Sequence, residues 1–219
     1  MKLSQSREQI ADYTLAQIAA LFPVGRAPSR REFAGHVRAA LERLEYCFAR
    51  IAHRNYSDEH QVYFDLLNSD QYCQYLYFLA NTVHQREGPP ALARKLFCLN
   101  KALHGFHCMY DTQLPSVFWI IHAVGTVLGK ATYGSHLVVR QNCTVGALGG
   151  QYPVLGDRVV LSAGASNIGR CHIGRNVMLG PGCSILNEDI PADTLVTAPP
   201  RLKNRPNSPR AFSTHFREG

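Results

Sequence analysis

The chain has 219 residues, 46% of them hydrophobic, which is enough for one domain or a pair of small ones around a substantial core. It contains no apolar run of about 18 residues and opens with no basic-then-apolar signal segment, so we expect neither a membrane span nor export, and predict the cytoplasm. The formal net charge of +7 predicts attraction to polyanions, but no nucleic-acid motif or basic-aromatic stacking pattern accompanies it, which argues against nucleic acid as the partner.

The first hundred or so residues carry the signals of helices. Apolar residues recur three or four positions apart, and Ser, Asp or Gly-Pro-Pro stands where each segment would begin. Helices are therefore predicted over residues 4–21, 30–53, from Ser57 onward, 69–85 and 91–103.

Between Val127 and Ile185 the sequence repeats with a period of six. A period of six cannot keep an apolar stripe on one face of a helix, but it is typical of a hexapeptide β-solenoid, in which each side of a coil takes six residues. The repeat runs in two registers offset by ten residues: Val127, Tyr133, Val139 and Val145, then Leu155, Leu161, Asn167, Ile173, Leu179 and Ile185.

A second column supports the same register. The position four after each marked residue is never charged, so we expect one large and one small side chain to point inward from each side of a coil. Three of the seven cysteines fall in this column, and no Cys-x-x-Cys occurs, so core thiols are predicted in place of disulfides or metal ligands. The column reads Ala131, Leu137, Cys143, Gly149, Val159, Ala165, Cys171, Val177 and Cys183.

These patterns predict an α+β protein with a helical domain over residues 1–108, a β-helix over 109–200 and a basic tail over 201–219. Three motifs flank or interrupt the repeats: His122-Ala123-Val124-Gly125, residues 144–150 (TVGALGG) and Pro199-Pro200-Arg201. Together they resemble the hexapeptide-repeat acyltransferases, and among them the serine acetyltransferase group, over about residues 60 to 205. The resemblance implies a left-handed parallel β-helix that transfers an acetyl group from acetyl-CoA to an acceptor hydroxyl.

The resemblance also implies the catalytic residues. His122 matches the general base of that group, and a histidine suits the task because its ordinary pKa of about 6.5 lets it accept the hydroxyl proton near neutral pH. Asp111, eleven residues earlier, resembles the carboxylate that orients this histidine. The backbone around Ala147, Gly149 and Gly150 is the predicted oxyanion-stabilising element, because glycine lets the main chain approach a ligand closely.

For acetyl-CoA, the resemblance implies a groove between two solenoids, and therefore a homotrimer, with a dimer of trimers as a further expectation. No metal is expected. Main-chain groups at the coil corners would hold the pantetheine arm, and basic residues beyond them would meet the phosphates. The predicted cofactor residues are Ser162, Ala163, Gly164, Gly180, Pro181, Arg201 and Lys203, in addition to Ala147, Gly149 and Gly150.

The acceptor is predicted from departures from the serine enzymes. Those enzymes carry an aspartate before the catalytic histidine and an Arg-His pair after the Gly-Gly turn, where this chain has Ile121 and Gln151-Tyr152-Pro153. An unpaired serine carboxylate would cost several kcal/mol, on the order of an unpaired buried charge. A hydroxyl of a capsule or other surface polysaccharide is therefore the preferred acceptor, and serine, in cysteine biosynthesis, is the alternative. The candidate acceptor-binding residues are Gln151, Tyr152, Asp65 and Asp70.

Two alternatives come from other classes of protein. A γ-carbonic-anhydrase-like metalloenzyme shares this solenoid, but the His-x-x-x-x-His spacing expected of its zinc ligands does not occur in the repeats. A non-catalytic trimeric subunit would keep the fold without the chemistry.

Overall fold

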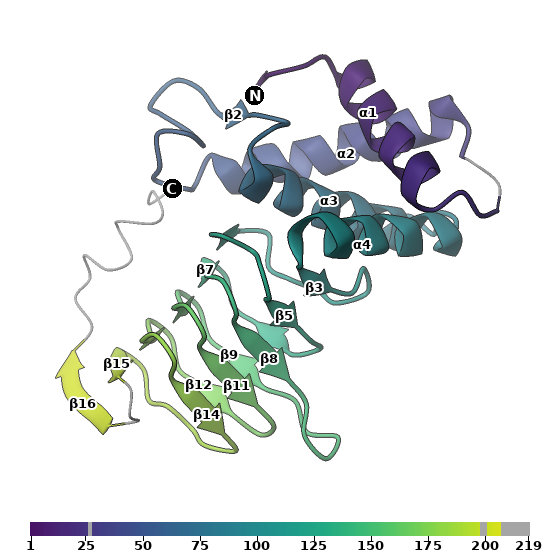
Figure 1. Ribbon diagram of the computed structural model, residues 1–219. Coiled ribbons are helices and arrows are strands. Elements are labelled where there is room, and N and C mark those ends of the chain that lie inside the picture. Colours follow the sequence, from purple (N-terminus) through teal and green to yellow (C-terminus); the bar gives the residue numbers. More distant parts are fainter. Residues whose placement is uncertain (26–27, 198–200, 207–219) are drawn as a thin grey trace.

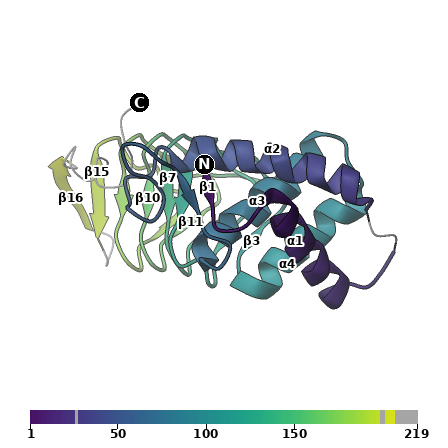
Figure 2. The same ribbon diagram turned by 90° about the horizontal axis from the view of Figure 1, so that it is seen from above.

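The computed structural model describes residues 1–25 and 28–197, and residues 201–206 as backbone only. Within these ranges a bundle of helices precedes a three-sided parallel β-helix, which confirms the predicted α+β class and left-handed β-helix (Figure 1). Seen from above, the helices occupy one end of the molecule and the solenoid extends away from them (Figure 2).

The bundle is built around α3 (Ser69–Gln85), which packs on both α2 (Arg30–Phe48) and α4 (Pro90–His104) and is buried over most of its length. The Asn68 side chain caps α3 at its first turn, one residue before the predicted start. A capping box of Ser6 and Gln9 begins α1 (Arg7–Leu21), which packs on α2 and α4. The short strands β1 (Lys2–Leu3) and β2 (Tyr63–Phe64) pair in parallel beside the bundle.

Two helix predictions were wrong. No helix begins at Ser57: this residue bridges to Val62, and the Asp58 carboxylate accepts the backbone N–H groups of His60 and Gln61, which closes a turn instead. The second helix stops at Phe48 and not at residue 53, because the backbone then tightens into turns that bond Arg50 to Cys47 and Ile51 to Phe48.

Three parallel sheets form the sides of the solenoid. We refer to them as the first, second and third sheets, in the order in which each coil visits them. The first sheet contains β4 (Phe118–Ile120), β7 (Leu137–Val139), β10 (Val160–Leu161), β13 (Met178–Leu179) and β15 (Thr194–Thr197), with β16 (Arg201–Pro206) added antiparallel at its end. The second contains β3 (His107–Cys108), β5 (Val127–Leu128), β8 (Thr144–Gly146), β11 (Ser166–Ile168) and β14 (Ser184–Leu186); the third contains β6 (Thr132–Tyr133), β9 (Val154–Leu155) and β12 (His172–Ile173).

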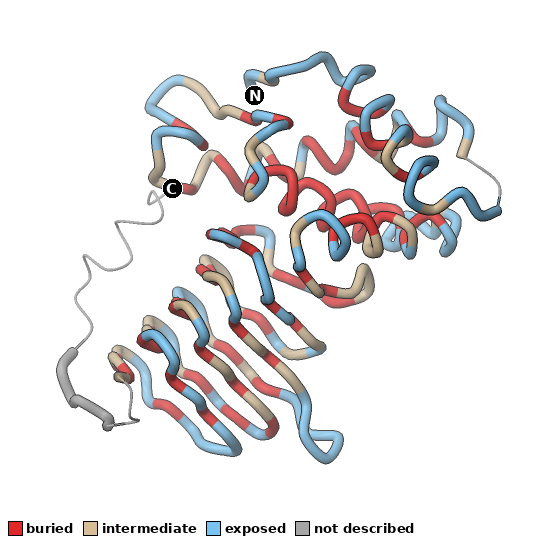
Figure 3. The backbone as a smooth tube through the Cα atoms, viewed as in Figure 1, coloured by how far each residue is buried: buried red, intermediate tan, exposed pale blue. Residues whose placement is uncertain are grey.

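The inward columns predicted from the period of six are buried, with one shift in the first coil (Figure 3). Val127 is 38% exposed, because the neighbouring Leu128 pairs with Val145 and takes the inward place. In the second column Gly149 is exposed and Ala131 is half-buried, so the small column begins at Leu137 and is interrupted at the loop after β8. The other marked positions are buried as predicted.

All seven cysteines are free thiols, and Cys143, Cys171 and Cys183 are buried in the solenoid, as predicted. Burial raises the pKa of the Cys143 and Cys183 thiols, so they stay protonated and pack as small apolar groups. Among the described residues, no helix is both long and apolar enough to span a bilayer.

Asn167 is a polar exception in the apolar interior. It is fully buried between Val145 and Ile185 of the neighbouring coils, and within the described structure neither its Oδ1 nor its Nδ2 atom has a hydrogen-bond partner. A buried amide without partners costs about 1–3 kcal/mol.

Replacing this residue with leucine should therefore stabilise the protein. We expect Asn167→Leu to raise the free energy of unfolding by about 1–2 kcal/mol, seen as a higher denaturant midpoint with an unchanged slope. Asn187→Leu is the matched control and should destabilise, because Asn187 has a left-handed backbone and its Oδ1 accepts the Arg170 N–H. A lower midpoint for Asn167→Leu would contradict this account.

Candidate active site

Several of the predicted site residues lie on one edge of the solenoid, the first corner, where each coil turns from the first sheet to the second. The corner segments are 121–126, 140–143, 162–165 and 180–183. They stack because the N–H groups of Asn142, Gly164 and Gly182 donate to the carbonyls of Val124, Gln141 and Ala163 in the preceding coil. Of the predicted residues, this corner carries His122, Ser162, Ala163, Gly164, Gly180 and Pro181.

His122 is held at this corner by an aspartate of the helical bundle. The His122 backbone N–H donates to Asp70 Oδ1 at 3.0 Å, and its ring Nδ1 lies 3.6 Å from Asp70 Oδ2. The Asp70 side chain is 19% exposed and comes from the first turn of α3, whereas the His122 side chain is 70% exposed. Asp70 therefore holds His122 on the side that faces the helical bundle, and the rest of the imidazole ring is exposed to solvent.

The left-handed backbone of His122 is a feature of the solenoid and not of the chemistry. His122 has φ of 55°, but other corner residues such as His136, Asn142 and Arg158 adopt the same region. What distinguishes His122 from them is therefore its contact with Asp70.

The groups behind Asp70 are neutral. His104 of α4 is largely buried and bonds to Asn100, and burial lowers its pKa to about 4. Burial, followed by the charge of Asp70, raises the pKa of the Cys73 thiol well above its ordinary value. Neither group carries a charge near neutral pH, and the Asp70 carboxylate faces the His122 imidazole.

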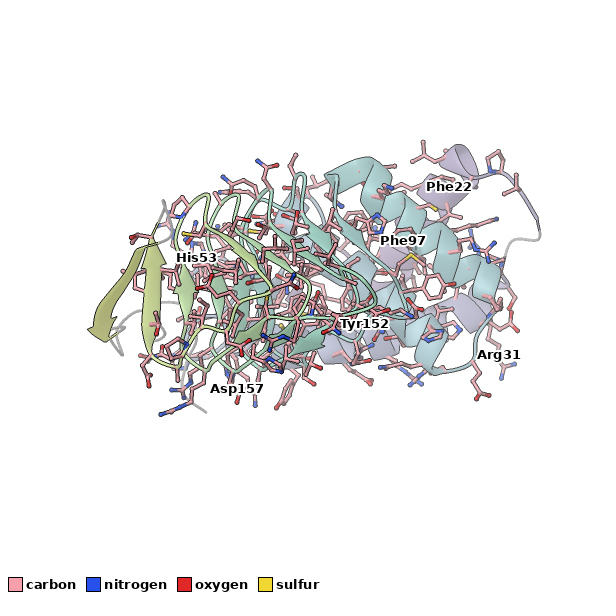
Figure 4. The ribbon with its side chains drawn as sticks, turned by 90° about the horizontal axis from the view of Figure 1, so that it is seen from below. Phe22, Arg31, His53, Phe97, Tyr152 and Asp157 are labelled. Atoms are coloured by element: carbon pink, nitrogen blue, oxygen red, sulfur yellow. The ribbon has the colours of Figure 1, made fainter. Side chains whose placement is uncertain are left out.

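The other predicted residues gather at the second corner, where the coils turn from the second sheet to the third. Asp111 forms an ion pair with Lys130 there, with 3.0 Å between Asp111 Oδ2 and Lys130 Nζ. The hydrogen bond to Asp111 and its charge raise the pKa of Lys130 above its ordinary value. Tyr152, labelled in Figure 4, is 53% exposed on the loop that projects after β8 in Figure 1.

That loop also carries the predicted oxyanion element. Leu148 and Gln151 close it through paired backbone hydrogen bonds, and Gly149 and Gly150 between them have φ of 57° and 76°. Such angles favour glycine, and no atom of the described structure lies within 4 Å of where a Cβ would stand on either residue. The loop therefore projects from the solenoid, and its backbone conformation favours glycine at both positions.

The predicted pairing of Asp111 with His122 is not what the structure shows, because the partners are Lys130 and Asp70 respectively. His122 and Lys130 flank β5, so one side of the solenoid separates them, roughly 15–20 Å for five to six extended residues. Sequence reasoning had no signal for Lys130, since nothing in the repeat marks it.

Three further predicted residues stand apart. Asp65 accepts the Leu67 N–H within a turn before α3. Arg201 and Lys203 belong to β16, but their side chains lie outside the described residues, as do Pro199, Pro200 and the tail from 207 onward. A cleft of about 480 Å³ lined by Arg43, Tyr46 and Phe78, among others, lies on the bundle, and its lining includes neither His122 nor the loop after β8.

The fold and the stacked corners define a left-handed β-helix of hexapeptide repeats, with a histidine at the corner nearest the helices. Comparisons with known proteins agree. The chain is 34% identical over 119 residues to the serine acetyltransferase of Synechococcus elongatus, covering 52% of this chain and 48% of that one, so it matches about half the length of this relative. It is 29% identical over 127 residues to the serine acetyltransferase of Helicobacter pylori strain J99, covering 56% of this chain and 74% of that protein.

The crystal structure of the serine acetyltransferase from Vibrio cholerae superposes with a TM-score of 0.73 at 20% identity, covering 95% of this chain and 83% of the other. At that identity the match shows the fold. No protein-family model matches the chain. The homologues and structural neighbours confirm the resemblance to the serine acetyltransferase-like group of the hexapeptide-repeat acyltransferases.

The neutral His104 behind Asp70 gives the protein an acid-sensitive stability. As pH falls from about 6.5 to about 4, an unfolded histidine takes up a proton that folded His104 does not, so stability falls with pH in this window. The loss attributable to His104 is at most about 3 kcal/mol, at 1.36 kcal/mol per pKa unit.

His104→Gln should therefore flatten the dependence of unfolding free energy on pH between 7 and 4, measured by urea titration at each pH. The exposed His60→Gln is the matched control and should leave the wild-type curve unchanged. Parallel curves for wild type and His104→Gln would contradict the assignment.

Proposed function

We propose that this protein is an acetyl-CoA-dependent O-acetyltransferase with His122 as general base and serine as its acceptor. The observation that carries the proposal is the position of His122, anchored by a carboxylate and exposed on the corner that also carries the small residues predicted to line the cofactor groove. The named activity of the relatives supports serine over the polysaccharide hydroxyl preferred from sequence.

The chemistry requires one proton to be moved twice. His122 removes the acceptor hydroxyl proton as the oxygen attacks the thioester carbonyl, and the carbonyl oxygen becomes negatively charged. Collapse of this intermediate breaks the C–S bond and releases CoA, whose sulfur takes the proton from the imidazolium. The exposed ring of His122 can reach an acceptor in a site that a single chain leaves open.

The residues at the first corner fit a narrow, extended cofactor. Gly182 has φ of 69° and no atom lies within 4 Å of where its Cβ would stand, while Gly164 faces only Gly182. The small residues therefore leave the corner column open beside His122. Main-chain groups of Ser162, Ala163, Gly164, Gly180 and Pro181 would hold the pantetheine arm of acetyl-CoA, which supplies the activated acetyl group.

Assembly follows from the separation of the two corners. His122 and the glycine loop are about one solenoid side apart in a single chain, too far to act on one carbonyl. A second copy can supply the missing corner if solenoids pack side by side, and three such contacts close into the homotrimer expected from the sequence. Each active site would then combine His122 of one chain with the loop of its neighbour.

The alternatives from other classes find less support. The repeats do not contain the His-x-x-x-x-His spacing that the zinc ligands of a carbonic-anhydrase-like enzyme would need. A non-catalytic subunit would give no reason for an exposed histidine anchored by a carboxylate.

The direct test measures CoA release with acetyl-CoA and either serine, homoserine or a panel of sugars and oligosaccharides. Serine should drive CoA release and yield O-acetylserine by mass spectrometry, and His122→Ala should lower turnover by about two decades or more with the oligomer intact. The exposed His172→Ala should retain wild-type turnover. Turnover unchanged by His122→Ala would remove the mechanism, and CoA release with sugars alone would restore the polysaccharide reading.

Subunit complementation tests the shared site. His122→Ala and a variant with valine at both Gly149 and Gly150 should each be inactive as pure oligomers, the second because β-branched residues disfavour the left-handed loop backbone. Mixed oligomers, made by co-expression with two affinity tags, should recover a substantial fraction of activity, because some interfaces join an intact His122 to an intact loop.

Mixed oligomers as inactive as either parent would show that one chain supplies the whole site. Size measurement of each pure variant by light scattering controls for loss of assembly.

A further inference from the structure

We infer that two aspartates have exchanged the roles expected from sequence: Asp70 positions His122, and Asp111 with Lys130 binds the charged groups of an amino-acid acceptor. The inference deepens the proposed function and rests on it. It starts from two separate carboxylate contacts, Asp70 with the His122 imidazole at the first corner and the Asp111–Lys130 ion pair at the second.

Asp70 has the geometry of an orienting carboxylate. One oxygen accepts the His122 backbone N–H at 3.0 Å, which fixes the carboxylate against the corner, and the other faces ring Nδ1 at 3.6 Å. That second distance is too long for a hydrogen bond, but a small rotation of an exposed ring shortens it, as contacts of catalytic groups often do when substrate binds. Nδ1 would then carry the hydrogen and Nε2 would be left as the free base.

The surroundings of Asp70 favour this role over acceptor binding. Its side chain is largely buried and its flanking groups His104, Cys73 and Tyr56 are neutral, so its charge is available to stabilise the imidazolium formed during transfer. Both oxygens already face His122, which leaves little access for a substrate ammonium.

Asp111 and Lys130 offer the complementary charges that a free amino acid carries. The Lys130 ammonium can bind an α-carboxylate and Asp111 Oδ2 an α-ammonium, each exchanging part of the existing pair for a substrate partner. Oδ1 of Asp111 is buried without a hydrogen-bond partner in the described structure, so Oδ2 is the oxygen that faces Lys130 and the acceptor. Tyr152, 53% exposed on the loop after β8, lies at the same corner.

The Asp111–Lys130 pair can replace the charges of the Arg-His pair that the serine enzymes carry in the loop after the Gly-Gly turn. The cost of an unpaired serine carboxylate disappears once Lys130 faces it, and a neutral sugar gains nothing from the exchange because it carries neither charge. The acceptor class is therefore a small zwitterionic amino acid with a hydroxyl group, bound at the second corner of one chain and attacked at the first corner of its neighbour.

The test separates turnover from acceptor affinity in matched variants. Asp70→Asn keeps the bond to the His122 N–H and should lower kcat about 100-fold while the KM for serine changes less than about 3-fold. Lys130→Met and Asp111→Asn should raise the KM for serine about 10-fold or more, leaving kcat and the KM for acetyl-CoA within about 3-fold. The exposed Asp12→Asn and Lys101→Met are controls that should match wild type.

Nitrogen-15 NMR of the His122 ring provides a readout that does not depend on turnover. Wild type should show hydrogen on Nδ1, and Asp70→Asn should shift the ring toward the Nε2–H tautomer; calorimetry should show serine binding that Lys130→Met weakens. If no acceptor is acetylated, the proposed function fails, and these two measurements still decide the inference.

The reverse pattern would overturn the exchange of roles. A raised serine KM with preserved kcat in Asp70→Asn, together with a loss of kcat in Asp111→Asn, would return Asp70 to the acceptor and Asp111 to the histidine. An unchanged His122 tautomer in Asp70→Asn, or serine binding indifferent to Lys130, would overturn the corresponding half.

Discussion

The regular stacking of coils is the constraint on which the rest of this structure depends. The interior strands of the solenoid satisfy their backbone groups through the coils on either side, so a shift in one coil would displace those beyond it. The buried columns that include Leu161, Leu179 and Cys183 set this register from inside. Corners must then fall in columns, and residues far apart in sequence come to share one edge.

The bundle contributes more than a cap on the first coil. Its central helix α3 begins at Ser69, and the Asp70 carboxylate in its first turn reaches across the domain junction to His122. Gln74, one turn further along α3, bonds with the backbone of Phe118 and Ile120 on β4, the strand just before His122. The helix therefore fixes both the strand and the histidine that follows it, so the position of His122 depends on docking between the two parts of the chain.

The fold could be predicted from the sequence because each side of a solenoid coil takes six residues, which produces the period of six. Sequence reasoning placed the inward columns correctly in the regular coils and failed at Val127, where Leu128 packs inward instead, and at Ala131 and Gly149. It failed at Ser57, where an Asx turn and a helix start share the same residue types. His122 was found because a motif surrounds it, but its partner was not, because no spacing rule relates residue 70 to residue 122: their contact exists only once bundle and solenoid have docked.

The two carboxylate contacts, Asp70 with His122 and Asp111 with Lys130, also bear on how a solenoid of this kind could change the acceptor that it binds. The corner that carries His122 is tied to the repeats and to α3, so a change there disturbs both the base and the fold. Asp111, Lys130 and Tyr152 lie at a corner where loops before the first complete coil and after β8 project from the regular repeat. Loop residues can vary without breaking the ladder of coils, so the proposed acceptor site can change while His122, the proposed general base, and the column of small residues beside it stay fixed. On the proposed function, a chain without a cationic pair in this loop can still bind a carboxylate, because Lys130 in an earlier coil supplies a cation at the same corner.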